Sequence, residues 1–144
     1  MEENENGKLL IDSVQLRFGD NVVLQSAYVT SYKGRVTGVL GRNGTGKSCL
    51  FKCIMGGIRP QNKYINSDAE FCVLDEPFSN IAPIYDEKIR AMIQEQKARK
   101  GIIITDHVYE EILRVADDLF LLRDGFTYQI HSRDDLVRLG YILS

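Results

Sequence analysis

The sequence has few cysteines, no tryptophan and no long apolar run. Its three cysteines, Cys49, Cys53 and Cys72, include no CxxC pair, so we expect reduced thiols rather than a disulfide framework or a cysteine-based metal site. The longest apolar runs, such as residues 119–122, are far shorter than the ~20 residues that a membrane-spanning helix needs. Residues 1–6 are acidic and polar, unlike the start of a secretory signal. These absences favour a cytosolic protein.

An excess of charge of one sign is lacking as well. The 18 Lys+Arg and 20 Asp+Glu residues give a net charge of −2, so we expect no nucleic acid partner and no direct attraction to an anionic membrane. The 144 residues, 44% of them hydrophobic, suffice for one domain with a buried core. We interpret residues 1–7 as a disordered leader and residues 8–144 as that domain.

Hydrophobic periodicity predicts the order of strands and helices. Alternating apolar residues, Val14, Leu16 and Phe18, predict a strand over residues 9–18. Residues 61–67 show little periodicity, so no regular element is expected there. The other expected strands cover residues 22–29, 35–40, 70–75, 102–105, 119–123 and 126–130, and the expected helices cover 47–56, 85–100, 108–116 and 134–140.

The character of these elements predicts the fold class. Continuously apolar strands that alternate with helices predict an α/β fold with a mostly parallel sheet covered on both faces. The alternating strands at the amino end predict an antiparallel β subdomain beside it. The helix over residues 85–100 is amphipathic, and we expect Ile89, Met92 and Ile93 on its buried side. Ligands of such folds bind at the carboxyl ends of the parallel strands.

The segment GRNGTGKS, residues 41–48, lies between an expected strand and an expected helix. This is the spacing of a phosphate-binding loop, so the expected domain is a P-loop NTPase core. Its glycines allow the backbone N–H groups to curl around phosphates. Lys47 can reach the β- and γ-phosphates, and the Ser48 hydroxyl can ligate Mg²⁺. A glycine-rich turn that merely contains a lysine is the alternative, and the agreement of eight positions and both flanks argues against it.

Acidic and imidazole side chains follow two further expected strands. Asp75 ends an apolar strand, the Walker B arrangement in which a carboxylate helps to hold Mg²⁺. Glu76 is suited to orient or deprotonate an attacking water. His107 would lie at the same edge of the sheet, within reach of a γ-phosphate. The alternatives are a simple strand end for the two carboxylates and a solvated side chain for His107. His131 lacks such a context and is interpreted as a surface residue.

Taken together, three segments resemble the ATP-binding cassette (ABC) ATPases. They are residues 40–48, which contain Asn43, residues 73–79, in which Pro77 follows the acidic pair, and residues 105–107. The resemblance extends over residues 9–136, includes the closing LLRDG of residues 121–125, and implies ATP and Mg²⁺ as ligands. It implies that Phe18 stacks on adenine, that Glu76 is the catalytic carboxylate and that His107 is the switch histidine. The implied nucleotide contacts are Phe18, Gly41, Asn43, Gly44, Thr45, Gly46, Lys47, Ser48 and Cys49, and the implied metal ligands are Ser48 and Asp75.

The resemblance also implies partners and a cellular location. Proteins similar to this one work as ATP-binding subunits of transporters. The implied partners are a transmembrane permease subunit and a second ATPase subunit, in a homodimer or heterodimer. The implied location is the cytoplasm, at the inner face of a membrane.

The chain departs from the family pattern between Ser48 and Asp75. These residues are separated by 75 − 48 = 27 positions, where the family has a glutamine loop and a helical subdomain with a Leu-Ser-Gly-Gly signature. No Ser-Gly-Gly occurs in the sequence, and Gln61 is too early to serve as the glutamine. Ala82 replaces the aspartate of the dimer-facing loop. A natural deletion, an engineered one or an unobserved segment near residues 60–67 would each leave this sequence.

This departure leads to a prediction about the reaction. Without the donors of the signature loop, the transition-state charge is poorly stabilised, so we expect this chain to bind Mg·ATP and to hydrolyse it slowly. Two other functions stay open. One is a non-catalytic, nucleotide-responsive interaction module, and the other is an ABC protein that does not serve transport.

Overall fold

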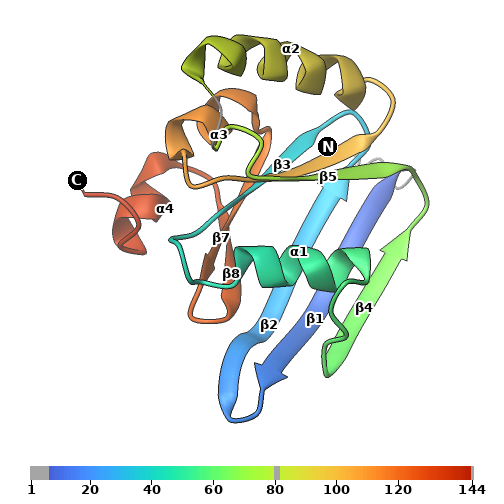
Figure 1. The fold of residues 1–144 in the computed structure, drawn as a ribbon, viewed down its shortest axis with the longest axis vertical. Helices are drawn as coiled ribbons and strands as arrows, with labels where there is room; N and C mark the ends of the chain where they lie inside the picture. The colour runs from blue at the N-terminus through green and yellow to red at the C-terminus, as the bar shows by residue number, and fades with distance from the viewer. Residues whose placement is uncertain (1–6, 80–81, 144) are drawn as a thin grey trace.

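The computed structural model describes residues 7–79 and 82–143, and within them it has eight strands in one sheet of order β4-β1-β2-β8-β7-β3-β6-β5 (Figure 1). Helices cover both faces of the sheet. The strands are β1 (Lys8–Phe18), β2 (Asn21–Tyr32), β3 (Val36–Leu40), β4 (Asn62–Ser67), β5 (Phe71–Asp75), β6 (Gly101–Thr105), β7 (Asp118–Arg123) and β8 (Phe126–Ile130). The helices are α1 (Lys47–Met55), the 3₁₀ helix η1 (Pro83–Tyr85), α2 (Asp86–Lys97), α3 (Tyr109–Val115) and α4 (Arg133–Arg138).

The parallel half of the sheet consists of β7, β3, β6 and β5. All five residues of β3 and of β6 are buried, as expected for parallel strands with both faces covered. The predicted α/β fold with a mostly parallel sheet is therefore confirmed. Strand β5, which we expected to be buried, is only half-buried because it forms the end of the sheet.

The antiparallel half consists of β2, β1 and β4, which confirms the antiparallel subdomain predicted at the amino end. Strand β8 joins it to the parallel half, since β8 pairs in parallel with β2 at Ser26 and Phe126 and antiparallel with β7. Strand β4 was not expected. Five of its six residues are exposed and only Ile65 is half-buried, so this edge strand lacks the apolar alternation by which strands are recognised.

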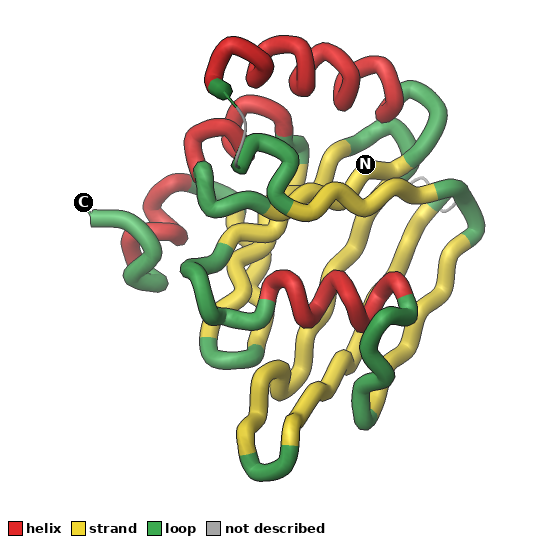
Figure 2. The backbone as a smooth tube through the Cα atoms, viewed as in Figure 1, coloured by secondary structure: helices red, strands yellow, loops and turns green. Residues whose placement is uncertain are grey.

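The two ends of the sheet are consecutive in sequence. Strands β4 and β5 lie at opposite ends of the strand order, yet only residues 68–70 link them. The sheet must therefore curl until its ends meet, and α1 lies inside the curl between β5 and the antiparallel strands (Figure 2). Leu50, Phe51 and Cys53 of α1 are buried there against residues of both halves.

The link between β4 and β5 is tied to the start of the domain. Asp68 accepts hydrogen bonds from the backbone N–H groups of Gly7 and Lys8, both at 2.8 Å. The Gly7 carbonyl in turn accepts from the N–H of Lys33 at 2.7 Å. Gly7, which we assigned to a disordered leader, is therefore buried and part of the fold, whereas residues 1–6 lie outside the described residues.

Helices α2, α3 and α4 cover the other face of the parallel half. Ile93 of α2 is buried in a second core, and Ile89 is packed against it. Met92, which we expected on the same side, is 58% exposed, because it lies beyond the edge of the stripe that faces the sheet. No helix within residues 7–79 and 82–143 combines the length and the apolar character needed to cross a bilayer.

Candidate nucleotide-binding site

The glycine-rich loop connects the carboxyl end of β3 to the start of α1. Gly44 and Gly46 have φ angles of 82° and 98°, a region that residues with a Cβ rarely occupy. The Thr45 backbone N–H and hydroxyl both donate to the Arg42 carbonyl, at 3.2 and 2.7 Å. The loop is thus already curled by its own hydrogen bonds. Gly46 also lies close to β2, since a Cβ there would be 2.9 Å from Val23 Cγ1.

Lys47, the first residue of α1, is a buried cation. Its side chain is only 5% exposed and donates a hydrogen bond to the Gly41 carbonyl. Burial lowers the pKa of Lys47, and the nearby carboxylates of Glu76, Asp106 and Asp75 oppose this shift. A positive charge held in a partly desolvated loop and bonded to a neutral carbonyl is suited to bind phosphate.

Ser48 and Asp75 face each other across the gap between α1 and β5. The Ser48 hydroxyl lies 3.5 Å from Asp75 Oδ2, at the limit of a hydrogen bond. Partial burial and then the charge of Glu76 raise the pKa of Asp75, while Ser48 and Lys47 act in the opposite direction. A hydroxyl and a carboxylate oxygen at this separation fit a shared hard cation such as Mg²⁺. No cluster of three or more His, Cys, Asp or Glu side chains within the described residues could hold a metal by itself, so phosphate oxygens and water would complete such a site.

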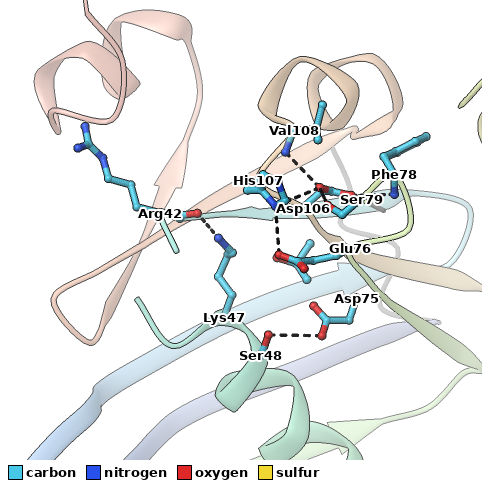
Figure 3. Close-up of polar contacts among 12 residues, drawn as sticks. Arg42, Lys47, Ser48, Asp75, Glu76, Phe78, Ser79, Asp106, His107 and Val108 are labelled. Carbon is cyan, nitrogen blue, oxygen red and sulfur yellow. Dashed lines mark hydrogen bonds and ion pairs between the residues drawn. The ribbon is translucent and has the colours of Figure 1, made fainter. Parts of the chain in front are cut away.

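Glu76 and His107 meet at the adjacent strand ends. His107 Nδ1 lies 3.3 Å from Glu76 Oε1 (Figure 3). Glu76 has a φ of 52°, a left-handed conformation that costs a non-glycine residue about 1–2 kcal/mol. Its backbone N–H donates to the Thr105 carbonyl at 2.7 Å, which holds the strained residue beside β6. Such strain is concentrated at functional sites.

Asp106 is a residue of this site that the sequence analysis did not assign. It lies between Thr105 and His107, and it is fully buried. Its carboxylate accepts hydrogen bonds from the Phe78 N–H at 2.8 Å, the Ser79 hydroxyl at 2.6 Å and the Val108 N–H at 3.1 Å. The sequence signal was an acidic residue at the end of a continuously apolar strand, a place where a carboxylate needs partners.

A hollow of ≈ 360 Å³ runs from the phosphate loop to the end of β1. Phe18, 52% exposed, and Glu76 both line it. Cys49, partly buried, contributes from the first turn of α1. The complete lining is Phe18, Asn21, Val23, Arg42, Asn43, Gly44, Gly46, Lys47, Ser48, Cys49 and Glu76.

The structure brings most of the predicted site residues together. Gly41 and Thr45 hold the loop and its lysine from within, and the metal pair and the Glu76–His107 pair lie beside it. Gln61 lies elsewhere. Its side-chain amide exchanges two hydrogen bonds with the backbone of Arg17, at 2.8 and 2.9 Å. His131 is exposed on the loop before α4.

Comparisons with known proteins assign the fold and the loop to one family. The family model described as ABC transporter matches residues 24–135. Solved structures share the fold at low identity. A nucleotide-free ATP-binding cassette from an ABC transporter superposes with a TM-score of 0.81 at 13% identity, over 92% of this chain and 94% of that one. A bacterial Atm1-family ABC exporter with ATP bound gives 0.80 at 12% identity, over 96% of this chain and 41% of that one.

Curated relatives match parts of the chain. The lipopolysaccharide export system ATP-binding protein LptB of Acidithiobacillus ferridurans is 37% identical over 68 residues, which is 46% of this chain and 28% of that protein. The zinc import ATP-binding protein ZnuC of Jannaschia sp. (strain CCS1) is 35% identical over 52 residues, which is 36% of this chain and 21% of that protein. The matched segments thus span about a quarter of these relatives. The chain has an α/β fold with a glycine-rich loop of the P-loop type, and it belongs to the ABC transporter family.

Proposed function

We propose that this chain binds Mg·ATP as the ATP-binding subunit of an ABC transporter. The observation that carries the proposal is the convergence of Lys47, Ser48 and Asp75 at one edge of the sheet. A buried cation bonded to a carbonyl and a hydroxyl facing a carboxylate come from two separate elements. Membership of the ABC transporter family supports the same ligand.

Each part of the hollow has a role in this proposal. The curled loop from Gly41 to Gly46 directs backbone N–H groups at the phosphates, and Lys47 adds a point charge at the β- and γ-phosphates. The Ser48 and Asp75 oxygens would hold Mg²⁺, whose charge neutralises the phosphates. Phe18, which lines the hollow and is 52% exposed, offers an aromatic ring on which the base would stack. Asn43 and Cys49 line the walls between them.

Hydrolysis would depend on Glu76 and His107. Glu76 would orient or deprotonate the attacking water, and His107 would contact the γ-phosphate. The chain lacks the signature sequence that closes the γ-phosphate off from water in the family it resembles. Loss of a single preorganised donor already lowers a rate about 10²–10³-fold. We therefore propose that this chain alone turns ATP over slowly.

The partners and location follow from the same proposal. The ATP-binding proteins that it resembles serve export of lipopolysaccharide in one case and import of zinc in another. For this chain we propose a transmembrane permease partner and a second ATPase subunit, identical or related. It would act in the cytoplasm, at the inner face of the membrane.

A second candidate function has a specific observation in its favour. The link of residues 68–70 is short, and Asp68 bonds it to Gly7 and Lys8. Because this link is held by hydrogen bonds, the chain is suited to fold as it stands, with only 27 positions between Ser48 and Asp75. A non-catalytic, nucleotide-responsive interaction module would need no more than this.

Calorimetric titration with ATP and Mg²⁺ tests the proposal, with AMP as the matched probe that lacks the β- and γ-phosphates. We expect ATP to bind and AMP to bind far more weakly. Phosphate release by the same sample should stay below about 1 s⁻¹, the lower end of ordinary enzyme turnover. Failure to bind ATP at about 1 mM, the upper end of usual substrate affinities, would refute the proposal. Binding with turnover above that rate would refute only its slow-hydrolysis part.

A further inference from the structure

The fully buried carboxylate of Asp106 lies beside His107 but is too far to bond it. Asp106 Oδ1 is 3.8 Å from His107 Nδ1. The three donors of Asp106 come instead from the segment after β5, Phe78 and Ser79, and from the start of α3, Val108. A buried carboxylate is costly unless it is hydrogen-bonded, so these contacts fix the segment after Glu76 against the end of β6.

The Ser79 hydroxyl transmits the effect of Asp106 to the imidazole. Its oxygen is 2.6 Å from Asp106 Oδ1 and 3.3 Å from His107 Nδ1. A serine hydroxyl has one proton to donate and two lone pairs to accept with. Donation to a carboxylate at the shorter distance is the stronger bond. The proton therefore goes to Asp106, and towards His107 the Ser79 oxygen is an acceptor.

Within residues 7–79 and 82–143, two oxygens lie within hydrogen-bond distance of His107 Nδ1, and both are then acceptors. Glu76 Oε1 at 3.3 Å is a carboxylate oxygen, and Ser79 has already committed its proton. A neutral imidazole carries one proton, on either Nδ1 or Nε2, and its neighbours decide which. We infer that Asp106 and Ser79 are positioning residues that fix neutral His107 as the Nδ1–H tautomer, with Nε2 as the ring's acceptor.

The inference gives His107 a defined chemistry, and only this consequence rests on the proposed function. A neutral ring whose Nε2 is an acceptor can receive a hydrogen bond from water. It cannot donate one from Nε2 to a phosphate oxygen, which is itself an acceptor. Contact between Nε2 and a γ-phosphate then requires a protonated ring. Among the described residues, the acidic groups within 4 Å of His107 Nδ1 are Glu76 and Asp106.

Long-range ¹H–¹⁵N spectra of the nucleotide-free protein test the inference, because they distinguish the two ring nitrogens. At about pH 8 we expect the Nδ1–H form of the neutral His107 ring to exceed the Nε2–H form at least about tenfold. The chain has two histidines, so His131 reports the behaviour of an exposed ring in the same spectrum. A dominant Nε2–H form of His107 would overturn the inference from the wild-type protein alone.

Variants of Ser79 distinguish an effect on the His107 tautomer from a general effect on folding. Ser79→Ala should lower the Nδ1–H to Nε2–H ratio about 2- to 10-fold, the effect of one neutral hydrogen bond, and Ser79→Thr should restore it. Ser67→Ala is the matched control. The Ser67 hydroxyl, at the end of β4, donates to the Ala69 carbonyl at 2.8 Å, so its removal should leave the ratio unchanged. An unchanged ratio in folded Ser79→Ala would also contradict the inference. ATP binding plays no part in these spectra, so a failure of the proposed function and a failure of this inference remain distinguishable.

Discussion

Replacement of Lys47 by methionine separates the contribution of this buried side chain to folding stability from its contribution to phosphate binding. Methionine keeps most of the volume and removes the charge. In the free protein two effects oppose each other, since a desolvated charge disappears but the Gly41 carbonyl loses its donor. An orphaned carbonyl costs about 1–3 kcal/mol, and removal of a buried charge returns a similar amount. We therefore expect the free energy of unfolding to change by no more than about 1 kcal/mol.

The loss of the charge should appear as weaker stabilisation of the variant by ATP. At an ATP concentration 100 times its Kd, the wild-type protein gains about 2.7 kcal/mol of stability. A charge-assisted hydrogen bond contributes about 1.5–3 kcal/mol, so Lys47→Met should bind about 10- to 150-fold more weakly. At the same concentration the variant would gain only about 0.3–1.4 kcal/mol. With about 3 °C per kcal/mol for a chain of this size, Tm should rise about 8 °C for wild type and about 1–4 °C for the variant.

A matched control lies on the same helix. Lys52 is exposed on α1, so Lys52→Met makes the same chemical change outside the hollow and should keep the full rise in Tm. Differential scanning fluorimetry with and without Mg·ATP measures all three proteins. Equal rises for wild type and Lys47→Met would refute the assignment of Lys47 to the phosphates.

The lowered pKa of Lys47 predicts a pH-dependent difference in stability between wild type and Lys47→Met. Burial lowers this pKa from the ordinary 10.5, so between the folded value and 10.5 the unfolded chain binds more protons than the folded one. Wild-type stability should therefore rise with pH in that window relative to Lys47→Met. Urea unfolding of both proteins at a series of alkaline pH values measures the difference, and a falling difference would contradict the cause given for the shift.

Two further predictions concern the metal and the base. The pKa of Asp75 is raised above the ordinary 3.8, so wild type should bind ATP with Mg²⁺ more tightly than Asp75→Asn, and this advantage should decline as pH falls, beginning above pH 3.8. In nucleotide-free protein, wild-type stability should fall as pH rises from 3.8 to the raised pKa, because there the folded chain binds more protons than the unfolded one. Calorimetry at several pH values checks the first effect, and a pH-independent advantage would contradict it. Phe18→Ala should weaken ATP binding about 5- to 150-fold, because stacking on a base contributes about 1–3 kcal/mol. Val22→Ala, at a residue 53% exposed against 52% for Phe18, should change the affinity less than about twofold, and equal losses in the two variants would show that Phe18 does not contact the base.

The phosphate loop was predictable because its determinants are local. Glycines at positions 44 and 46 and the residues that follow them fix the curl within a few residues. Strands β3 and β6 were predictable for a related reason, since both faces are covered and every residue is apolar or small. Strand β4 was missed because an edge strand that is exposed on both faces leaves no such pattern.

The role of Asp106 could not be read from the sequence. Two of its donors, Phe78 and Ser79, are 28 and 27 positions away, and only the adjacency of β5 and β6 brings them within reach. The exposure of Met92 was missed for a similar reason. A helical stripe predicts one buried side, but only the packed structure shows that Ile89 and Ile93 face the second core while Met92 is exposed.

The place of the short link explains how the site can be intact in a chain of this spacing. Residues 68–70 enter β5 at its amino end, whereas Asp75 and Glu76 lie at its carboxyl end, about 13 Å away at 3.3 Å per residue. The loop before Lys47 and the His107 pair lie at that same carboxyl edge, on the neighbouring strands β3 and β6. A change in the length of the link therefore acts on the opposite edge of the sheet. The arrangement of Lys47, Ser48 and Asp75 therefore does not depend on the segment that carries the donors of the signature loop. For this reason we expect the chain to bind ATP more readily than it hydrolyses it.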